Sequence, residues 1–310
     1  MLTDGNLLNH DLDMSETATP RIILETLFPY LKVAAGYARL IQPKIQALPA
    51  KVGDNAFAEA LSDADLSIQN FIEVTLLSLF PQIRFYGEEY EQSSNTKYFR
   101  SIELGEQGDY LVTLDPIDGT RFYLDGHSNY QIILSVLNRD HYEAVLAISP
   151  AVKQYYYAIR GFGAYYGSLE MDFNQCKPLT LNPSSSRIFL GTKVGDLKPQ
   201  LSSKYDVIDI AASYSDTEQI PTVNGILSGD LSGVVLQSGQ FIDNAALGFI
   251  VETAGGFVTN FAGESLPPLH TCKNYKYNGV VMAASTSVQQ DLLTVTSSNY
   301  RQTDLGGAET

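Results

Sequence analysis

Residues 109–120 read DYLVTLDPIDGT, and they predict a strand that ends in a turn carrying two carboxylates. The first six residues alternate and include β-branched side chains, which predicts a strand with Asp115 at its exit. Pro116 has no N–H to donate, so we expect it to end the ladder. Asp118 and then Gly119 follow where the chain must turn. Two such close carboxylates repel each other unless a cation or a shared proton neutralises them. The alternative is an ordinary Asp-Gly turn.

The composition is that of a soluble globular protein of 310 residues, with 44% hydrophobic and 18% charged residues. This length predicts two domains, or one two-layered unit that is split in two. The net charge of -15 argues against a nucleic-acid polymer or a membrane as partner, but permits a small phosphorylated metabolite if a metal supplies positive charge. Cys176 and Cys272 are too few for a disulfide framework, and residues 1–19 are polar. We therefore expect a cytoplasmic protein without a signal peptide or a transmembrane helix.

Two helices are expected near the N-terminus. Pro20 is a favourable first-turn residue for a helix towards residue 41, but Pro29 interrupts the pattern and predicts a kink or a break. The second helix begins at Ser62, where Ser62 and Asp65 match a capping box.

Strands follow these helices. A short strand is expected at 83–86, and residues 90–108 read as a polar loop. The Gly-rich segment 161–167 is interpreted as part of a hairpin and not as a nucleotide loop, because no helix follows it. Three alternating runs predict an antiparallel meander: 130–137, 142–148 and 154–159.

The composition shifts near residues 181–185, where we place a domain boundary. An α+β domain of residues 1–181, with 1–19 flexible, should carry most of the acidic site residues. An α/β domain of residues 182–310 should supply Asp243. In that second domain a helix is expected at 243–254. Strands are expected at 188–190, 233–236, 257–259 and 280–284.

Five acidic residues lie at the ends of the expected elements: Asp65, Glu88, Asp115, Asp118 and Asp243. Each alone could be a helix cap or a turn residue. Together they offer only oxygen ligands, which suits Mg²⁺ or Mn²⁺ and disfavours zinc.

Other motif interpretations fail on spacing. An EF-hand beginning at Asp115 would need Glu at its twelfth position, which is Gly126. A haloacid-dehalogenase phosphatase would require Asp-x-Asp, whereas two residues separate Asp115 from Asp118. None of the four histidines lies in a serine-hydrolase context.

Three ordered segments carry a resemblance to a known family. Gly-Glu-Glu at 87–89, Asp-Pro-Ile-Asp-Gly-Thr at 115–120, and Asp243-x-Ala-Ala with Ala-Gly-Gly at 254–256 resemble the signatures of the inositol monophosphatase family. The resemblance implies a layered α-β-α-β-α sandwich, with an antiparallel sheet in the N-terminal half and a mixed sheet in the C-terminal half. It also implies a lithium-sensitive, Mg²⁺-dependent phosphatase and a homodimer.

The resemblance assigns roles to particular residues. Thr120, hydrogen-bonded to Asp65, would activate the attacking water on the ion near Glu88. The amides of Gly119 and Thr120 would receive the phosphate oxygens. Two or three Mg²⁺ ions would be held by Glu88, Asp115, the Ile117 carbonyl, Asp118 and Asp243.

The sequence departs from the family at the substrate side. Ile242 replaces a Trp, Leu247 replaces a Gly, and Leu236 stands where inositol-specific members carry a Glu; residues 213–226 lack their Gly-Ser-Ala segment. Arg121 could contact a second phosphate or only solvent. The expected function is phosphomonoester hydrolysis of a small phosphorylated polyol or sugar. The alternatives are a fructose-1,6-bisphosphatase, a 3′(2′),5′-bisphosphate nucleotidase, or a non-catalytic metal-binding regulatory relative.

Overall fold

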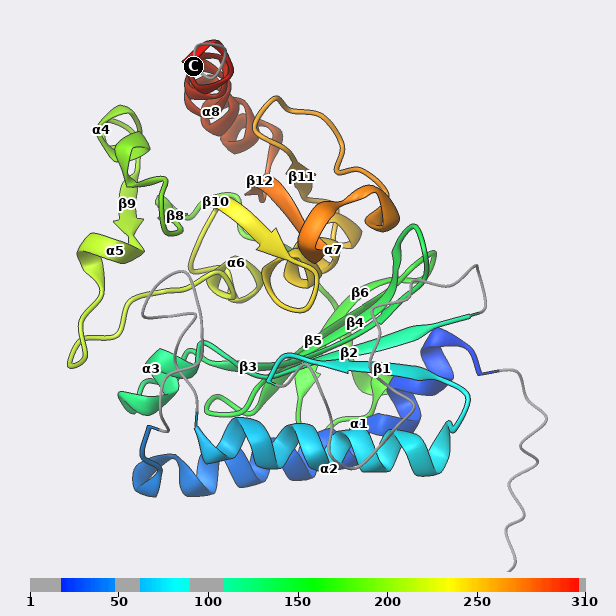
Figure 1. Cartoon of the computed structure of the whole chain (residues 1–310). Coiled ribbons are helices and arrows are strands. Elements are labelled where there is room, and N and C mark those ends of the chain that lie inside the picture. Colours follow the sequence, from blue (N-terminus) through cyan, green and yellow to red (C-terminus); the bar gives the residue numbers. More distant parts are fainter. Residues whose placement is uncertain (1–17, 48–61, 90–108, 307–310) are drawn as a thin grey trace, which may run out of the picture.

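The structure, a computed structural model, describes residues 18–47, 62–89 and 109–306. The expectations of a flexible segment before residue 18 and of a polar loop at 90–108 lie outside these residues. Helices and sheets alternate in five layers (Figure 1). This is the layered sandwich that the resemblance implied.

The first layer consists of α1, Pro20–Ile41, and α2, Asp63–Leu79. Of the two outcomes predicted at Pro29, the break is wrong, because α1 is one continuous helix, and the kink stays a prediction. The neighbouring Leu27, Phe28 and Leu31 are buried against the first sheet, and this packing offsets the hydrogen bond that proline removes. The predicted capping box at the start of α2 is confirmed.

The second layer is a seven-stranded sheet in the order β1 to β7. Strands β3 to β6 form the predicted meander, since each pairs antiparallel with the next. The pair β1 and β2 is parallel, so the sheet is mixed where we expected it to be antiparallel. A parallel pair requires a crossover connection, and a long segment of chain separates these two strands. The strands are β1 Arg84–Gly87, β2 Leu111–Asp118, β3 Gln131–Leu137, β4 Tyr142–Ser149, β5 Gln154–Ile159, β6 Gly163–Ser168 and β7 Lys177–Pro178.

Strand β2 does not end at Pro116, as its sequence predicted, but continues to Asp118. Asp115 is opposite Ile133 and Asp118 is opposite Gln131, so three steps along β2 match two steps along β3. This irregularity is a β-bulge, in which one residue is left out of the ladder. Proline is tolerated at a bulge because no ladder donor is needed there.

The remaining three layers contain α7, a second sheet and the C-terminal helix. The middle layer is α7, Asn244–Thr253, with the short α6, Gly225–Ser228. The second sheet has the order β11-β12-β10-β8-β9, and α8, Thr286–Gly306, with α4, Lys198–Leu201, covers its outer face. Its strands are β8 Arg187–Leu190, β9 Asp206–Asp209, β10 Gly233–Gln240, β11 Phe257–Thr259 and β12 Lys276–Ala283.

Three apolar cores bind the five layers together. One core joins α1 and α2 to the first sheet, one lies between the two sheets around α7, and one lies beneath α8. The sheets divide the chain between Pro178 and Arg187, but both contribute to the middle core. Separate domains with a boundary at residue 181 therefore stay a prediction. No helix of the residues described has the length and apolar character needed to cross a membrane.

Candidate active site

The predicted acidic residues meet at one cavity between the sheets, with a volume of 660 Å³. Its lining includes all of the predicted ligand and phosphate-binding residues: Glu88, Asp115, Ile117, Asp118, Gly119, Thr120 and Asp243. They come from the ends of β1 and β2, from the start of α3, Thr120–Leu124, and from the residue before α7. Asp65 is fully buried and reaches the site through Thr120.

The bulge and the turn after it position the two central carboxylates. The Ile117 N–H donates to Asp115 Oδ1 at 3.0 Å, which fixes the Asp115 carboxylate inside the bulge. Gly119 then has φ 87°, a left-handed conformation that side chains with a Cβ adopt at a cost. The glycine allows the chain to reverse directly into α3 and places Thr120 next to Asp118.

Thr120 connects the cavity to the buried Asp65. Its Oγ1 lies 3.1 Å from Asp65 Oδ1 and 2.9 Å from the Ile117 carbonyl oxygen, so its single hydrogen can be donated to only one of them at a time. Asp65 Oδ2 also accepts the N–H and the hydroxyl of Ser62. The capping role of Asp65 and its contact with Thr120 therefore coexist, each using a different oxygen.

Unbalanced negative charge accumulates at this end of the cavity. Burial, and then the charge of Glu88, raise the pKa of Asp118 to about 7. Burial and then Asp118 raise the pKa of Asp243 well above its ordinary value, although the Asn244 N–H opposes the shift.

A hard divalent cation would relieve this repulsion, and the oxygen-only donors that line the cavity suit Mg²⁺. Within the described residues, no three His, Cys, Asp or Glu side chains already stand close enough together to hold one ion. The ligand set is chemically suitable for Mg²⁺, and its geometry stays a prediction.

The opposite wall of the cavity is formed by the second sheet. Leu236 and Ile242, two of the three departures from the family pattern, line the cavity. Leu247 does not line it and is fully buried on α7, so its effect on specificity stays a prediction. Sequence reasoning missed Lys193 and Lys276, which also line the cavity. They lie at the exit of β8 and the start of β12, and no local motif marks either of them.

The Arg121 side chain does not contact solvent alone, because it is bonded to two neighbouring side chains. Its Nε donates to the Tyr214 hydroxyl at 2.9 Å and lies 3.3 Å from Asp125 Oδ2, and the Tyr214 hydroxyl donates to the same carboxylate. Arg121 also lines the cavity. Tyr214 was missed because 93 residues separate it from Arg121.

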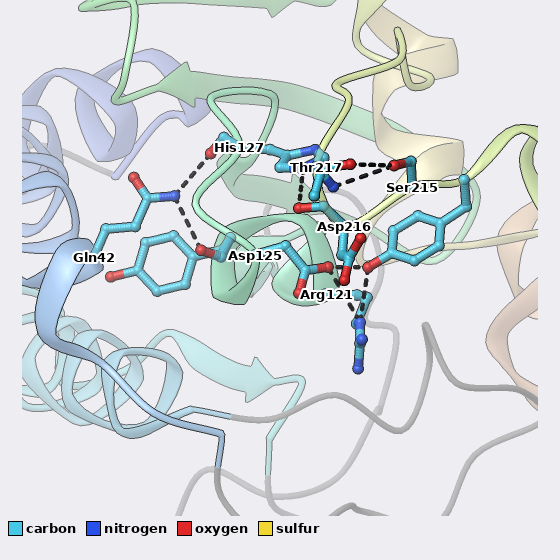
Figure 2. Close-up of polar contacts among 9 residues, drawn as sticks. Gln42, Arg121, Asp125, His127, Ser215, Asp216 and Thr217 are labelled. Carbon is cyan, nitrogen blue, oxygen red and sulfur yellow. Dashed lines mark hydrogen bonds and ion pairs between the residues drawn. The ribbon is translucent and has the colours of Figure 1, made fainter.

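Residues 214–222 hold the segment after α3 in place. The His127 ring donates to the Asp216 carbonyl at 3.2 Å, and the Ser128 N–H and hydroxyl both donate to Gln219 Oε1 at 2.8 Å. From the other side, Gln42 Nε2 donates to the carbonyls of Tyr123 and His127, as Figure 2 shows together with the Arg121 and Asp125 contacts. The helix that begins with Thr120 is therefore braced from two directions.

The fold is a layered α-β-α-β-α sandwich with an acid-lined cavity between its two sheets. A family model described as the inositol monophosphatase family matches residues 25–302. The putative Nus factor SuhB of Neisseria meningitidis serogroup A is 26% identical over 261 residues, which cover 80% of this chain and 88% of that protein. The chain belongs to the inositol monophosphatase family.

Solved structures show the same fold. An IMPase of Thermotoga maritima superposes with a TM-score of 0.68 at 17% identity, covering 90% of this chain and 98% of that chain. An IMPase/NADP phosphatase solved with Mg²⁺ and phosphate gives a TM-score of 0.64 at 18% identity, covering 89% and 95%. The predicted fold class and family are confirmed.

Proposed function

We propose that this chain is a Mg²⁺-dependent phosphomonoesterase that hydrolyses a small phosphorylated polyol or sugar. The observation that carries the proposal is the hydrogen bond between Thr120 and the buried Asp65 at the edge of a cavity lined by four carboxylates. The Mg²⁺ and phosphate bound to the structurally similar IMPase/NADP phosphatase support it.

In this proposal, different residues of the chain activate water, bind the phosphate and hold the metal. Thr120 orients the attacking water and can pass a proton towards Asp65, to which its hydroxyl is already bonded. The amides of Gly119 and Thr120 receive phosphate oxygens at the turn after β2. Mg²⁺ would be held by Glu88, Asp115, the Ile117 carbonyl, Asp118 and Asp243. When bound, it supplies positive charge to the phosphate and lowers the pKa of water.

A second candidate is a phosphatase for substrates with two phosphates. Among the residues that the structure describes, three cationic side chains line the cavity: Arg121, Lys193 and Lys276. Leu236 cannot accept hydrogen bonds from a polyol as the acidic residue implied by the family pattern would. This combination favours a leaving alcohol that carries its own anionic group, as in fructose 1,6-bisphosphate or a 3′,5′-bisphosphate nucleotide.

A substrate panel tests both candidates and also the non-catalytic alternative. We include this alternative because one relative is named as a putative Nus factor and not as a phosphatase. The assay measures phosphate released from inositol 1-phosphate, fructose 1,6-bisphosphate, a 3′,5′-bisphosphate nucleotide and NADP, with Mg²⁺ and with a chelator. We expect Mg²⁺-dependent release that Li⁺ inhibits, since the family resemblance implies lithium sensitivity. Absence of release from every compound, while Mg²⁺ binding is detected by calorimetry, would overturn the enzyme proposal.

A further inference from the structure

A second cavity lies along one side of α7, and we call it the α7 side cavity. It is lined by α7 (Figure 1), by the start of β4 and the end of β5, by β11 and β12, and by residues 265–267. Its volume is 210 Å³, or about seven water molecules at their share of liquid volume. No described residue lines both this cavity and the acidic one, so the α7 side cavity is separate from the candidate active site.

The segment 265–267 is held in place by the residues that follow it. The Leu269 N–H donates to the Asp140 carbonyl at 3.1 Å, and the His270 N–H donates to the Arg139 carbonyl at 3.0 Å. His270 Nδ1 also lies 2.9 Å from Asp140 Oδ1. The turn between β3 and β4 therefore fixes this side of the cavity.

Two opposite charges line the α7 side cavity without pairing with each other. Among the described residues, Arg160 and Glu252 form no ion pair, and the Glu252 carboxylate has no hydrogen-bond partner. Arg160 donates through Nε to the Tyr142 carbonyl at 2.9 Å, and its guanidinium lies 5.3 Å from the centre of the Phe249 ring. Its two terminal amino groups bond to none of the described residues, so they can bind a carboxylate through two parallel hydrogen bonds.

A buried hydroxyl lies near both charges. Tyr277 lines the cavity and is only 6% exposed, yet its hydroxyl has no hydrogen-bond partner among the described residues. Burial raises the pKa of Tyr277, and Cys272 and Glu252 raise it further. Arg160 acts in the opposite direction, so both charged side chains reach this hydroxyl. A buried hydroxyl is costly unless it is bonded, and a polar ligand in the cavity would supply the missing partner.

The rest of the lining limits the chemistry of a ligand. Val258, Leu266 and Pro267 give the cavity an apolar part. Arg160 is the only arginine or lysine in the described lining, and Glu143 Oε1 lies 3.7 Å from its Nε. A phosphate ester with two negative charges would therefore meet Glu252 without enough positive charge to compensate. A zwitterion carries no net charge and can use both Arg160 and Glu252.

We propose that the α7 side cavity binds a free α-amino acid with a small apolar side chain. Its carboxylate lies on Arg160, its ammonium group lies at Glu252, and its side chain packs against Val258 and Leu266. The Tyr142 hydroxyl donates to the Phe241 carbonyl at 2.7 Å, so the cavity adjoins the segment that leads to Asp243. The proposal does not depend on the proposed function, because binding needs none of the acidic cavity's residues.

Equilibrium dialysis of the full-length chain with labelled leucine or valine tests the proposal. The wild type should bind at least one of them saturably, with one molecule per chain. Arg160→Gln and Glu252→Gln should each weaken binding at least about tenfold, because each removes a charge-assisted hydrogen bond. Arg187→Gln is the control, since Arg187 pairs with Asp206 on the second sheet and its side chain is similarly exposed, 49% against 42% for Arg160. Absence of binding of both amino acids, or unchanged affinity in Arg160→Gln or Glu252→Gln, would overturn the proposal.

Two analogues of leucine test whether the ligand must carry both charges. Isoamylamine lacks the carboxylate and isocaproate lacks the ammonium group, so each should compete with leucine at least about tenfold more weakly than leucine itself. Competition by either analogue as strong as that of leucine would overturn the zwitterion and indicate a site for a simple cation or anion.

Tyr277→Phe tests the role of the hydroxyl. Affinity for the amino acid should fall about fivefold, whereas the melting temperature of the free protein should not fall, since the hydroxyl bonds to none of the described residues. A lower melting temperature with unchanged affinity would show that the hydroxyl is structural and would overturn its assignment to the ligand.

Discussion

The two walls of the cavity are built in different ways. On the first-sheet side, Asp115, Asp118 and Thr120 lie within six consecutive residues and are positioned by a bulge and a glycine turn. On the second-sheet side, Lys193 and Lys276 come from strand ends that are distant in the sequence. Asp115, Asp118 and Thr120 are thus set by local structure, whereas Lys193, Lys276 and also Asp243 reach the cavity only through the assembly of the two sheets.

The walls also differ in how their residues are held in place. Asp115 lies in β2, which is bonded to β1 and β3 and is buried on both faces. Lys193 is exposed, follows the end of β8, and has φ 68°, which is uncommon for a residue with a side chain. Substitution of Lys193 or Lys276 should therefore leave the position of Asp115 unchanged.

The largest effect should follow Asp118→Asn, which removes a charge from the first wall without changing its volume. If Asp118 holds Mg²⁺, kcat should fall by about 10³-fold, since metal stabilisation of the transition state amounts to several kcal/mol. The rise in melting temperature that Mg²⁺ gives the wild type should shrink. Without metal, the variant should melt at a higher temperature than the wild type, because the repulsion between Asp118 and Glu88 is gone.

Asp109→Asn provides the matched control for this variant. Asp109 is an exposed acid just before the same strand, paired with Arg84, and it lies outside the cavity. Its replacement should leave kcat and the Mg²⁺ response unchanged. Near-normal turnover by Asp118→Asn would show that the proposed ligand set is wrong.

Thr120→Ala should have the second largest effect. The substitution removes the hydroxyl that contacts Asp65, and kcat should fall by about 10²-fold while KM stays nearly constant. Thr120→Ser retains the hydroxyl and should keep most of the activity. Steady-state kinetics on the best substrate of the panel separates the two; equal losses in both variants would point to packing and not to proton transfer.

A change of selectivity is expected from the second wall. Lys276→Gln, and Lys193→Asn, which tolerates the left-handed backbone, should each lower kcat/KM for bisphosphates by about tenfold. Hydrolysis of a monophosphate should be unaffected. Lys177→Gln, on the remote β7, is the control. If mono- and bisphosphates lose activity equally, the lysines do not contact a second phosphate.

Local signals in the sequence were sufficient for the parts of the structure that fold locally. The capping box at Ser62, the meander and the helix after Asp243 were predicted because each rests on contacts close in sequence. The acidic residues were grouped as possible Mg²⁺ ligands from their positions at the ends of expected elements, and the family resemblance assigned them to one site. Spacing alone could not show that Glu88 and Asp243 line the same cavity as Asp118.

The wrong predictions share a physical cause, which is that neighbouring strands or helices overrode a local rule. Pro116 stays in a strand because of the register of β3, and Pro29 stays in a helix because of packing against the first sheet. The contact between Arg121 and Tyr214 could not be predicted, because it forms only when the second half of the chain packs onto α3.

Tyr214→Phe should give the smallest effect, and it tests whether the second half positions a residue of the first. The ring contact with Phe122, 5.4 Å between centroids, is kept, but the hydroxyl that accepts from Arg121 and donates to Asp125 is lost. Greater freedom of Arg121 should raise KM for a bisphosphate about threefold without changing kcat, and stability should fall by about 1 kcal/mol. Tyr205→Phe removes a similar hydroxyl-carboxylate bond, to Asp291, far from the cavity. Tyr205→Phe should lower stability and leave KM unchanged. If the two variants have the same KM, Tyr214 supports the fold and does not position Arg121.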